Sequence, residues 1–185
     1  PKADIEGFKE ECKKNHWALA YKDADRDDTE VPTKLKNNKL VSLVYPLTDF
    51  LGTVPGYNEF DISGWFLLFF TIFFGMIFGD GGYGLIVFVV TLFLIFKNKA
   101  AKKPFSPVFG LLLLLSISTM VWGAVTCTWF GIEPAKLPVW LTKLSVPMIS
   151  NAWDDFLWQP FWITEEGVGL SKDQNLQIFC FILAL

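Results

Sequence analysis

The stretch ISGWFLLFFTIFFGMIFGDGGYGLIVFVVTLFLIF, residues 62–96, decides the fold, because its only charged side chain is Asp80. As a single helix it would be about 52 Å long, well beyond the roughly 30 Å hydrocarbon core of a bilayer. Glycines and a charge interrupt it at residues 79–84, where a helix is expected to end. The stretch therefore predicts two membrane spans, residues 62–78 and 83–96, joined by a very tight turn.

Further apolar stretches extend this membrane body. Residues 107–130 predict a third span, and the apolar run from residue 176 onward predicts the start of a fourth. Residues 97–106 hold four lysines and no acid, which by the positive-inside rule predicts a cytoplasmic loop. Residues 131–175 hold more acids than lysines, with several tryptophans, and predict an external loop. Two spans separate the N-terminus from the lysine loop, so the N-terminus is expected to be cytoplasmic.

The composition agrees with a membrane protein. The 185 residues are 52% apolar and only 19% charged, whereas ordinary soluble domains are about 45–50% apolar and about 25% charged. A single soluble core of this length would have to bury 19 phenylalanines and 8 tryptophans, and disorder is excluded. The predicted fold is an all-α multi-pass membrane bundle with three full transmembrane helices and the start of a fourth. A short α+β cytoplasmic remnant is expected at the N-terminus.

The polar N-terminal part predicts the end of a soluble domain and a connector. Apolar residues at helical spacing over residues 4–15 predict a helix, and the alternation over residues 17–21 predicts a short strand. The acidic run at residues 22–30 predicts a solvated linker. Residues 40–51 are apolar and predict a connector along the head or the bilayer surface. The predicted domains are residues 1–30, the end of the cytoplasmic domain with its linker; residues 31–61, the juxtamembrane connector; and residues 62–185, the membrane domain.

Two sets of small residues lie on predicted helix faces. Gly75 and Gly79 form a GxxxG pattern, which lets another helix backbone approach closely, and the second span is one candidate partner. The alternative is chance, since glycine is common in membrane helices. A second set on the third span predicts either packing on neighbouring helices or the lining of a polar path: Ser116, Thr119, Gly123 and Thr126.

Asp80 is the sharpest single candidate for a functional residue. An ionisable group within an apolar run is costly and is by default a functional candidate. One interpretation is that Asp80 caps the second helix through the backbone amides of Gly82 or Tyr83. The other is that it lines a water-filled cavity on an ion path. The sequence leaves both open.

Signals of enzyme chemistry are missing from the sequence. It has no phosphate-binding Walker loop, no dinucleotide fingerprint and no serine-histidine or cysteine-histidine constellation. His16 is the only histidine, and the three cysteines, Cys12, Cys127 and Cys180, are far apart. The sequence therefore predicts no catalytic site, no cofactor and no metal site, and it predicts no nucleic-acid partner.

Residues 57–61, YNEFD, and residues 69–84, FFTIFFGMIFGDGGYG, resemble subunit a of the rotary V-type ATPases, and more closely its prokaryotic form, subunit I. That family has a tyrosine and acidic residues before the first span, then an aromatic-rich helix and a Phe-Gly-Asp-x-Gly-aromatic-Gly turn. Residues 31–37, VPTKLKN, resemble the family's lead-in, while Ile62 stands where the family usually has proline. The signature turn comprises Gly79, Asp80, Gly81, Gly82, Tyr83 and Gly84.

The resemblance implies a middle slice of such a subunit, and a chain that opens on Pro1 and stops at Leu185 inside an apolar run agrees with an excised fragment. The implied function is that of a membrane stator subunit of a rotary V-type ATPase or ATP synthase, which contributes to proton or sodium translocation. The family's ion-translocating arginine lies on a later helix. The only arginine here is Arg26, so no position carries that role.

The implied partners are the proteolipid rotor ring, the peripheral stalk and other ATPase subunits, and the lipid bilayer. The implied location is a bacterial plasma membrane. Two other classes remain as alternatives: a fragment of an unrelated secondary transporter, whose broken helices also place glycines at mid-membrane, and a purely structural membrane anchor.

Overall fold

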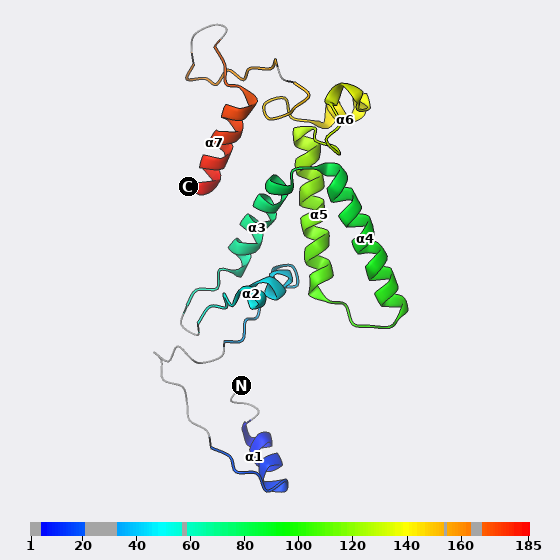
Figure 1. Ribbon diagram of the computed structural model, residues 1–185. Coiled ribbons are helices and arrows are strands. Elements are labelled where there is room, and N and C mark those ends of the chain that lie inside the picture. Colours follow the sequence, from blue (N-terminus) through cyan, green and yellow to red (C-terminus); the bar gives the residue numbers. More distant parts are fainter. Residues whose placement is uncertain (1–4, 21–32, 57–58, 154, 164–167) are drawn as a thin grey trace. The chain divides into compact units, whose positions relative to one another are not determined.

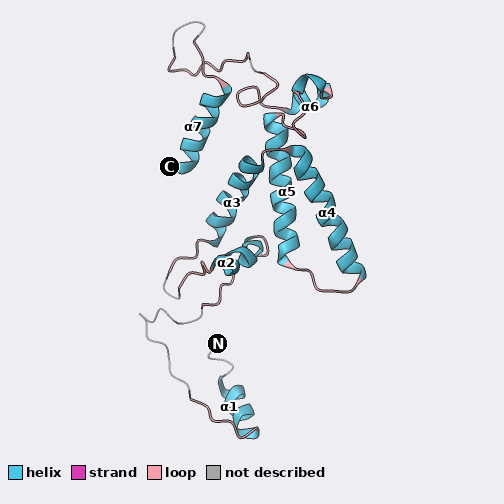
Figure 2. Ribbon diagram, in the orientation of Figure 1, coloured by secondary structure: helices cyan, strands magenta, loops and turns pink. Residues whose placement is uncertain are grey.

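Helices form the regular structure of the chain. Within the described residues there is no β-strand, only an isolated bridge between Trp158 and Leu170 (Figure 2). The computed structural model (Figure 1) describes residues 5–20, 33–56, 59–153, 155–163 and 168–185. The chain divides into two units, which are residues 1–34 with 54–60 and residues 35–53 with 61–185.

The first unit contains the described helix α1 (Ile5–Lys14). The strand predicted at residues 17–21 is not found, because residues 17–20 are exposed and form no strand. A strand needs a partner for its backbone hydrogen bonds, and no described segment pairs with this one. Residue 21 and the linker predicted at residues 22–30 lie outside the described residues.

The second unit is built on three long helices with α5 in the middle (Figure 1). They are α3 (Ser63–Phe78), α4 (Gly81–Ala100) and α5 (Pro107–Thr126). α5 contacts both α3 and α4, and its contact with α4 is the most extensive between any two described elements. The tight turn predicted after residue 78 therefore joins α3 and α4, and each of these helices packs mainly against α5.

The helix ends differ from the predicted spans by up to four residues. α4 begins at Gly81 and ends at Ala100, whereas residues 83–96 were predicted. Asp80 caps its first turn, and lysines in its last turn complement the negative end of the helix dipole. α5 ends at residue 126 instead of 130, because Cys127 adopts a left-handed conformation (φ 57°).

α7 (Lys172–Ala184) begins earlier than the predicted residue 176. Ser171 starts a capping box, in which two side chains satisfy backbone amides that the helix leaves open. The ring of Phe179 on α7 lies 5.7 Å from that of Trp122 on α5. The apolar run at the end of the chain is therefore a helix beside the bundle.

The segment predicted as a loop at residues 131–175 is partly helical. It contains η3 (Pro134–Lys136) and α6 (Val139–Leu144). The backbone amide of Val146 donates to the carbonyl of Val125 at 3.0 Å, which ties the segment to the end of α5. The segment is thus attached to the bundle and its loop character is interrupted by short helices.

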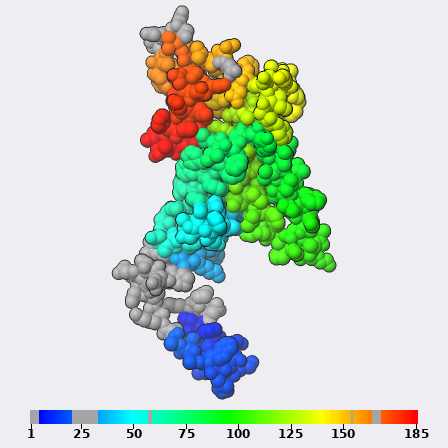
Figure 3. Space-filling view, in the orientation of Figure 1, coloured from blue at the N-terminus to red at the C-terminus, as the bar shows by residue number. Residues whose placement is uncertain are grey.

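By length and composition, two of the described helices, α4 and α5, can cross a membrane. Each has 20 residues and is about 30 Å long, whereas α3 has 16 residues and is about 24 Å long. Three full spans were predicted, but α3, although only one residue shorter than the predicted segment, is a shorter apolar helix than α4 and α5. Only 22% of the apolar window of α4 and 28% of that of α5 is buried, and Figure 3 shows the green side chains of α4 on the surface. Such exposed apolar faces are typical of helices in lipid.

The connector belongs to the core of the second unit. It consists of η2 (Val41–Val44) followed by α2 (Tyr45–Leu51). η2 packs between α3 and α5, a contact that the sequence did not predict. The fully buried Val44 forms the centre of this core with Leu67, Leu111 and Leu115.

Asp61 links the segment before η2 to the start of α3. Its Oδ1 accepts a hydrogen bond from the backbone amide of Ser63 at 2.9 Å, and its Oδ2 accepts one from the Asn37 side chain. Hydrogen bonds from the Ser63 side chain, the Ser63 backbone and Asn37 lower the pKa of Asp61 below its ordinary value of 3.8. The carboxylate thus stays ionised at neutral pH and helps to fix where α3 begins.

Candidate functional site

The turn between α3 and α4 is two residues long. α3 ends when Gly79 adopts a left-handed conformation (φ 55°), which glycine reaches without a steric penalty. The Gly79 amide still donates to the carbonyl of Gly75 at 2.8 Å. Asp80 is then extended (φ −122°, ψ 116°), and α4 starts at the next residue. The chain therefore passes from α3 to α4 within two residues.

The Asp80 carboxylate accepts hydrogen bonds from four backbone amides. Oδ1 accepts from Gly82 at 2.8 Å and from Tyr83 at 3.1 Å, which caps α4 as one of the two interpretations of the sequence predicted. Oδ1 also accepts from Phe130 at 3.0 Å, and Oδ2 accepts from Gly131 at 3.3 Å. Asp80 is only 7% exposed. One carboxylate therefore holds both the start of α4 and the turn that follows α5.

Glycines allow the backbones of α4 and α5 to touch at this site. A Cβ atom on Gly123 would overlap the backbone of Gly81, and one on Gly84 would lie 2.9 Å from the amide nitrogen of Met120. The Gly81 amide donates to the carbonyl of Thr128 at 2.9 Å. Asp80 reaches the amides of Phe130 and Gly131 because α4 and α5 approach each other closely. This approach requires glycine on both helices.

Two aromatic rings cover the first turn of α4. The ring of Phe130 lies over Gly82, where a Cβ atom would come within 2.5 Å of it. Tyr83 meets the same ring edge to face, at 5.5 Å between ring centroids. Trp129 lies over Gly81 in a similar way. The glycine-rich turn and the aromatic pair after α5 therefore form one contact.

Gly75 lies where α3 crosses α5. A Cβ atom there would come 2.5 Å from the Ser118 hydroxyl oxygen and 3.0 Å from the Ser118 carbonyl oxygen. The Ser118 hydroxyl donates to the carbonyl of Thr71 at 2.7 Å. The helix that approaches Gly75 is thus α5, the predicted third span. Gly79 has a different position, at the C-cap of α3, and a Cβ there would lie 4.0 Å from the nearest Trp122 atom.

The small and polar face of α5 is buried. The three hydroxyls on this face donate within α5, to carbonyls three or four residues earlier. They therefore need no partner on another helix. The residues of this face are Ser116, Thr119, Gly123 and Thr126.

A cavity of about 350 Å³ lies between α3, α4 and α5. Its walls are mostly apolar and include Phe74, Phe78 and Leu112, with Ser116 and Thr119 on the α5 side. The residues that line it carry no charge, and Asp80 is not among them. This cavity is suited to an apolar group.

Several residues of the site could not be picked out from the sequence. Phe130 and Gly131 supply two of the four amides on Asp80, although they are 50 and 51 residues away from it. The sequence signal available was that Gly131 follows the apolar run of the third span, which indicated a turn there. In the structure Gly131 does take a left-handed conformation (φ 66°). Nothing in its neighbourhood pointed to Asp80.

The sequence profile of the V-type ATPase 116 kDa subunit family matches residues 5–125. This match covers Asp80, all of α4 and all but the last residue of α5. The chain belongs to this family.

Relatives of the family extend the match to the end of the chain. V-type ATP synthase subunit I 1 of Treponema pallidum is 40% identical over all 185 residues, which is 27% of that relative's length. V-type ATP synthase subunit I of Borreliella burgdorferi is 40% identical over 131 residues, 71% of this chain and 21% of the relative. A-type ATP synthase subunit I of Archaeoglobus fulgidus is 37% identical over 105 residues, 56% of this chain and 15% of the relative. The chain thus spans about a quarter or less of the lengths of these relatives.

Proposed function

We propose that this chain is part of the membrane stator subunit of a rotary V-type ATPase or ATP synthase, and that the subunit contributes to proton or sodium translocation beside a proteolipid rotor ring. The observation that carries the proposal is the 40% identity over all 185 residues to a V-type ATP synthase subunit I. Family membership removes the alternative of an unrelated secondary transporter.

The geometry favours a structural role for these helices within that subunit. The hydroxyls of the buried α5 face are used within α5, and the Asp80 carboxylate is used by four amides. Groups that carry ions through a protein must instead be free to exchange partners. We therefore propose that α3, α4 and α5 form a rigid bundle that positions the ion path, and that Asp80 locks this bundle.

The location and partners follow from the same proposal. The subunit spans a bacterial plasma membrane several times, with its N-terminus in the cytoplasm, and it contacts the rotor ring, the peripheral stalk and other ATPase subunits. The only arginine in this sequence, Arg26, lies outside the described residues. The cation that an ion path of this family needs would have to come from elsewhere in the subunit.

The function is tested by recovering the natural full-length protein with an affinity tag from mildly solubilised membranes. We expect the proteolipid and the ATP-hydrolysing subunits to co-purify, and the complex to take up ions on addition of ATP after reconstitution into vesicles. A tagged multi-pass protein of another family serves as the control. If the tagged protein is recovered alone, from membranes in which a tag on an ATPase subunit recovers an intact complex, the proposal is wrong.

The orientation is tested with single cysteines in a background that lacks Cys12, Cys127 and Cys180. We expect an impermeant thiol reagent to label a Lys136→Cys variant in intact cells, because the Lys136 side chain is exposed and η3 lies in the segment that we propose to be external. An Ala100→Cys variant at the end of α4 should be labelled only after the membrane is opened. The reverse pattern would place the lysine loop outside and overturn the orientation.

A further inference from the structure

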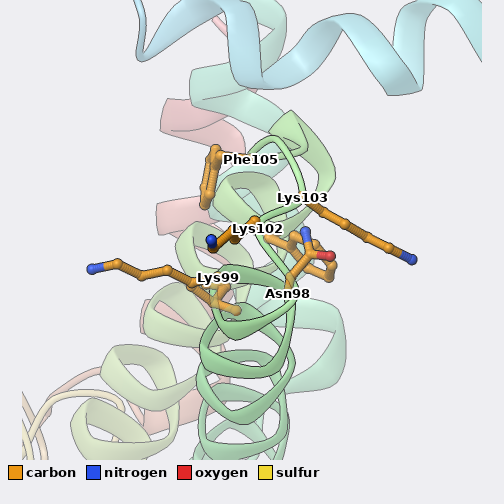
Figure 4. A pocket seen from close by; sticks show the side chains of 7 residues that line it. Asn98, Lys99, Lys102, Lys103 and Phe105 are labelled. Atoms are coloured by element: carbon orange, nitrogen blue, oxygen red, sulfur yellow. The ribbon is translucent and has the colours of Figure 1, made fainter.

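A basic pocket lies where α4 ends and the chain turns into α5. It has a volume of about 310 Å³ (Figure 4). Its polar lining comes from Asn98, Lys99, Lys102 and Lys103, and its apolar lining includes Phe105 and Phe109. In Figure 4 the Lys102 side chain lies beside Phe105, while those of Lys99 and Lys103 extend to opposite sides.

The lysines of this pocket have no acidic partner among the described residues. The loop and the adjoining helix ends, residues 97–109, contain no acid. An ion pair joins Lys136 and Glu133, on a different segment. Unpaired ammonium groups that flank a recess form a site of positive potential, which an anion would neutralise.

Lysine occupies a backbone position that favours glycine. Lys102 is left-handed (φ 52°), and its amide donates to the Lys99 carbonyl at 3.0 Å. The next amide, that of Lys103, donates to the Asn98 carbonyl at 3.2 Å. This is the Schellman pattern, in which glycine is the usual residue. A lysine here adds a cation at a conformational cost that a glycine would avoid.

The pocket is continuous with apolar helix surface. Ile95 lines it from the last turns of α4, where Phe93 and Phe96 are also 65% and 66% exposed. Phe105, at the other end of the loop, is 60% exposed. A free anion would have no use for this apolar surface, whereas a lipid has both an anionic phosphate and acyl chains. The combination of charge and apolar surface therefore selects a lipid.

We infer that this pocket binds an anionic phospholipid, with its phosphate beside Lys102, between the flanking positive charges of Lys99 and Lys103, and with its acyl chains along the end of α4. This site is separate from ion transport, and it uses the orientation proposed above, in which the lysine loop faces the cytoplasmic leaflet. Anionic lipids attract basic residues beside a membrane, with an effect of about fivefold in affinity for each lysine.

The test uses membranes that contain the tagged full-length protein and phosphatidylglycerol carrying a photoreactive group on its acyl chain. The matched probe is phosphatidylcholine with the same group. After irradiation, we expect peptides that cover residues 95–109 to be cross-linked by the anionic probe at least about tenfold more than by the neutral one. Equal cross-linking by the two probes would overturn the inference, and full competition by inorganic phosphate would reassign the pocket to a free anion.

Three variants separate charge from structure. A Lys99→Gln, Lys102→Gln, Lys103→Gln triple variant should reduce cross-linking by the anionic probe to the level of the neutral probe. A Lys34→Gln, Lys36→Gln, Lys39→Gln triple variant, which removes the same charge elsewhere, should keep more than half of the cross-linking by the anionic probe. Lys102→Gly relieves the left-handed backbone and removes one charge, so it should lower cross-linking about fivefold while the protein stays folded. Unchanged cross-linking in the first triple variant would show that the lysines do not hold the lipid. Because ion uptake is not measured, a failure of the proposed function would leave this result intact.

Discussion

Replacing Gly123 by alanine should prevent normal folding of the second unit. The added Cβ would overlap the Gly81 backbone, so α4 and α5 would have to separate, and the amides of Phe130 and Gly131 would lose Asp80. Overpacking of this kind costs about 3 kcal/mol, and here backbone and not a flexible side chain is in the way. We expect recovery of the folded full-length protein, measured by gel filtration of a fluorescent fusion, to fall roughly tenfold or more.

Gly64 provides the matched control for this substitution. It lies in the first turn of α3, and a Cβ atom there would meet the Val41 side chain at 3.9 Å, an ordinary contact. Alanine favours a helix over glycine by about 1 kcal/mol at either position, so propensity cannot explain a loss at Gly123. Normal recovery of Gly123→Ala, equal to that of Gly64→Ala, would show that the backbones of α4 and α5 are not in contact at Gly123.

Replacing Asp80 by alanine should be nearly as damaging, and replacing it by asparagine should not. Alanine removes the acceptor for four backbone amides, two at the start of α4 and two after α5. Loss of an N-cap costs about 1 kcal/mol, and each buried amide left without a partner costs about 1–3 kcal/mol more. Asparagine keeps an Oδ1 that can accept from Gly82, Tyr83 and Phe130, and loses the bond from Gly131.

The asparagine variant also separates the two interpretations of Asp80. If Asp80 locks the bundle, Asp80→Asn should assemble and retain more than half of the ATP-driven ion uptake, while Asp80→Ala should lose assembly and uptake together. If the carboxylate carries ions, the asparagine variant should assemble fully and still lose uptake. Assembly of both variants at normal levels would contradict the role of the four hydrogen bonds. The measurements are recovery of the complex and ion uptake by reconstituted vesicles.

The helices could be predicted from the sequence because their signals are local. The apolar runs and the break at residues 79–84 were sufficient to locate α3, α4 and α5 within a few residues. The start of α4 was placed too late because Gly81 and Gly82 were counted as helix breakers. Both glycines instead lie in the first turn of α4, which the Asp80 side chain caps and where glycine is tolerated.

The partners within the site could not be predicted, because each joins distant parts of the chain. Ser118 meets Gly75, and Phe130 meets Asp80, only after three helices have packed. The sequence had suggested the second span as one partner for Gly75, whereas the approaching backbone is that of α5. The burial of Val44 likewise depends on α3 and α5 together. Hydrophobic periodicity reports which face of a helix is buried and does not report against which neighbour.

The wedged connector has a mechanical consequence. Val44 has no exposed surface, and the Leu43 side chain comes so close to Gly110 on α5 that a Cβ there would lie 2.5 Å from it. A swivelling linker would let the chain ahead of residue 41 turn while the helices stayed still. Because Val44 is packed against α3 and α5, a sideways force on the residues just before it acts directly on these two helices.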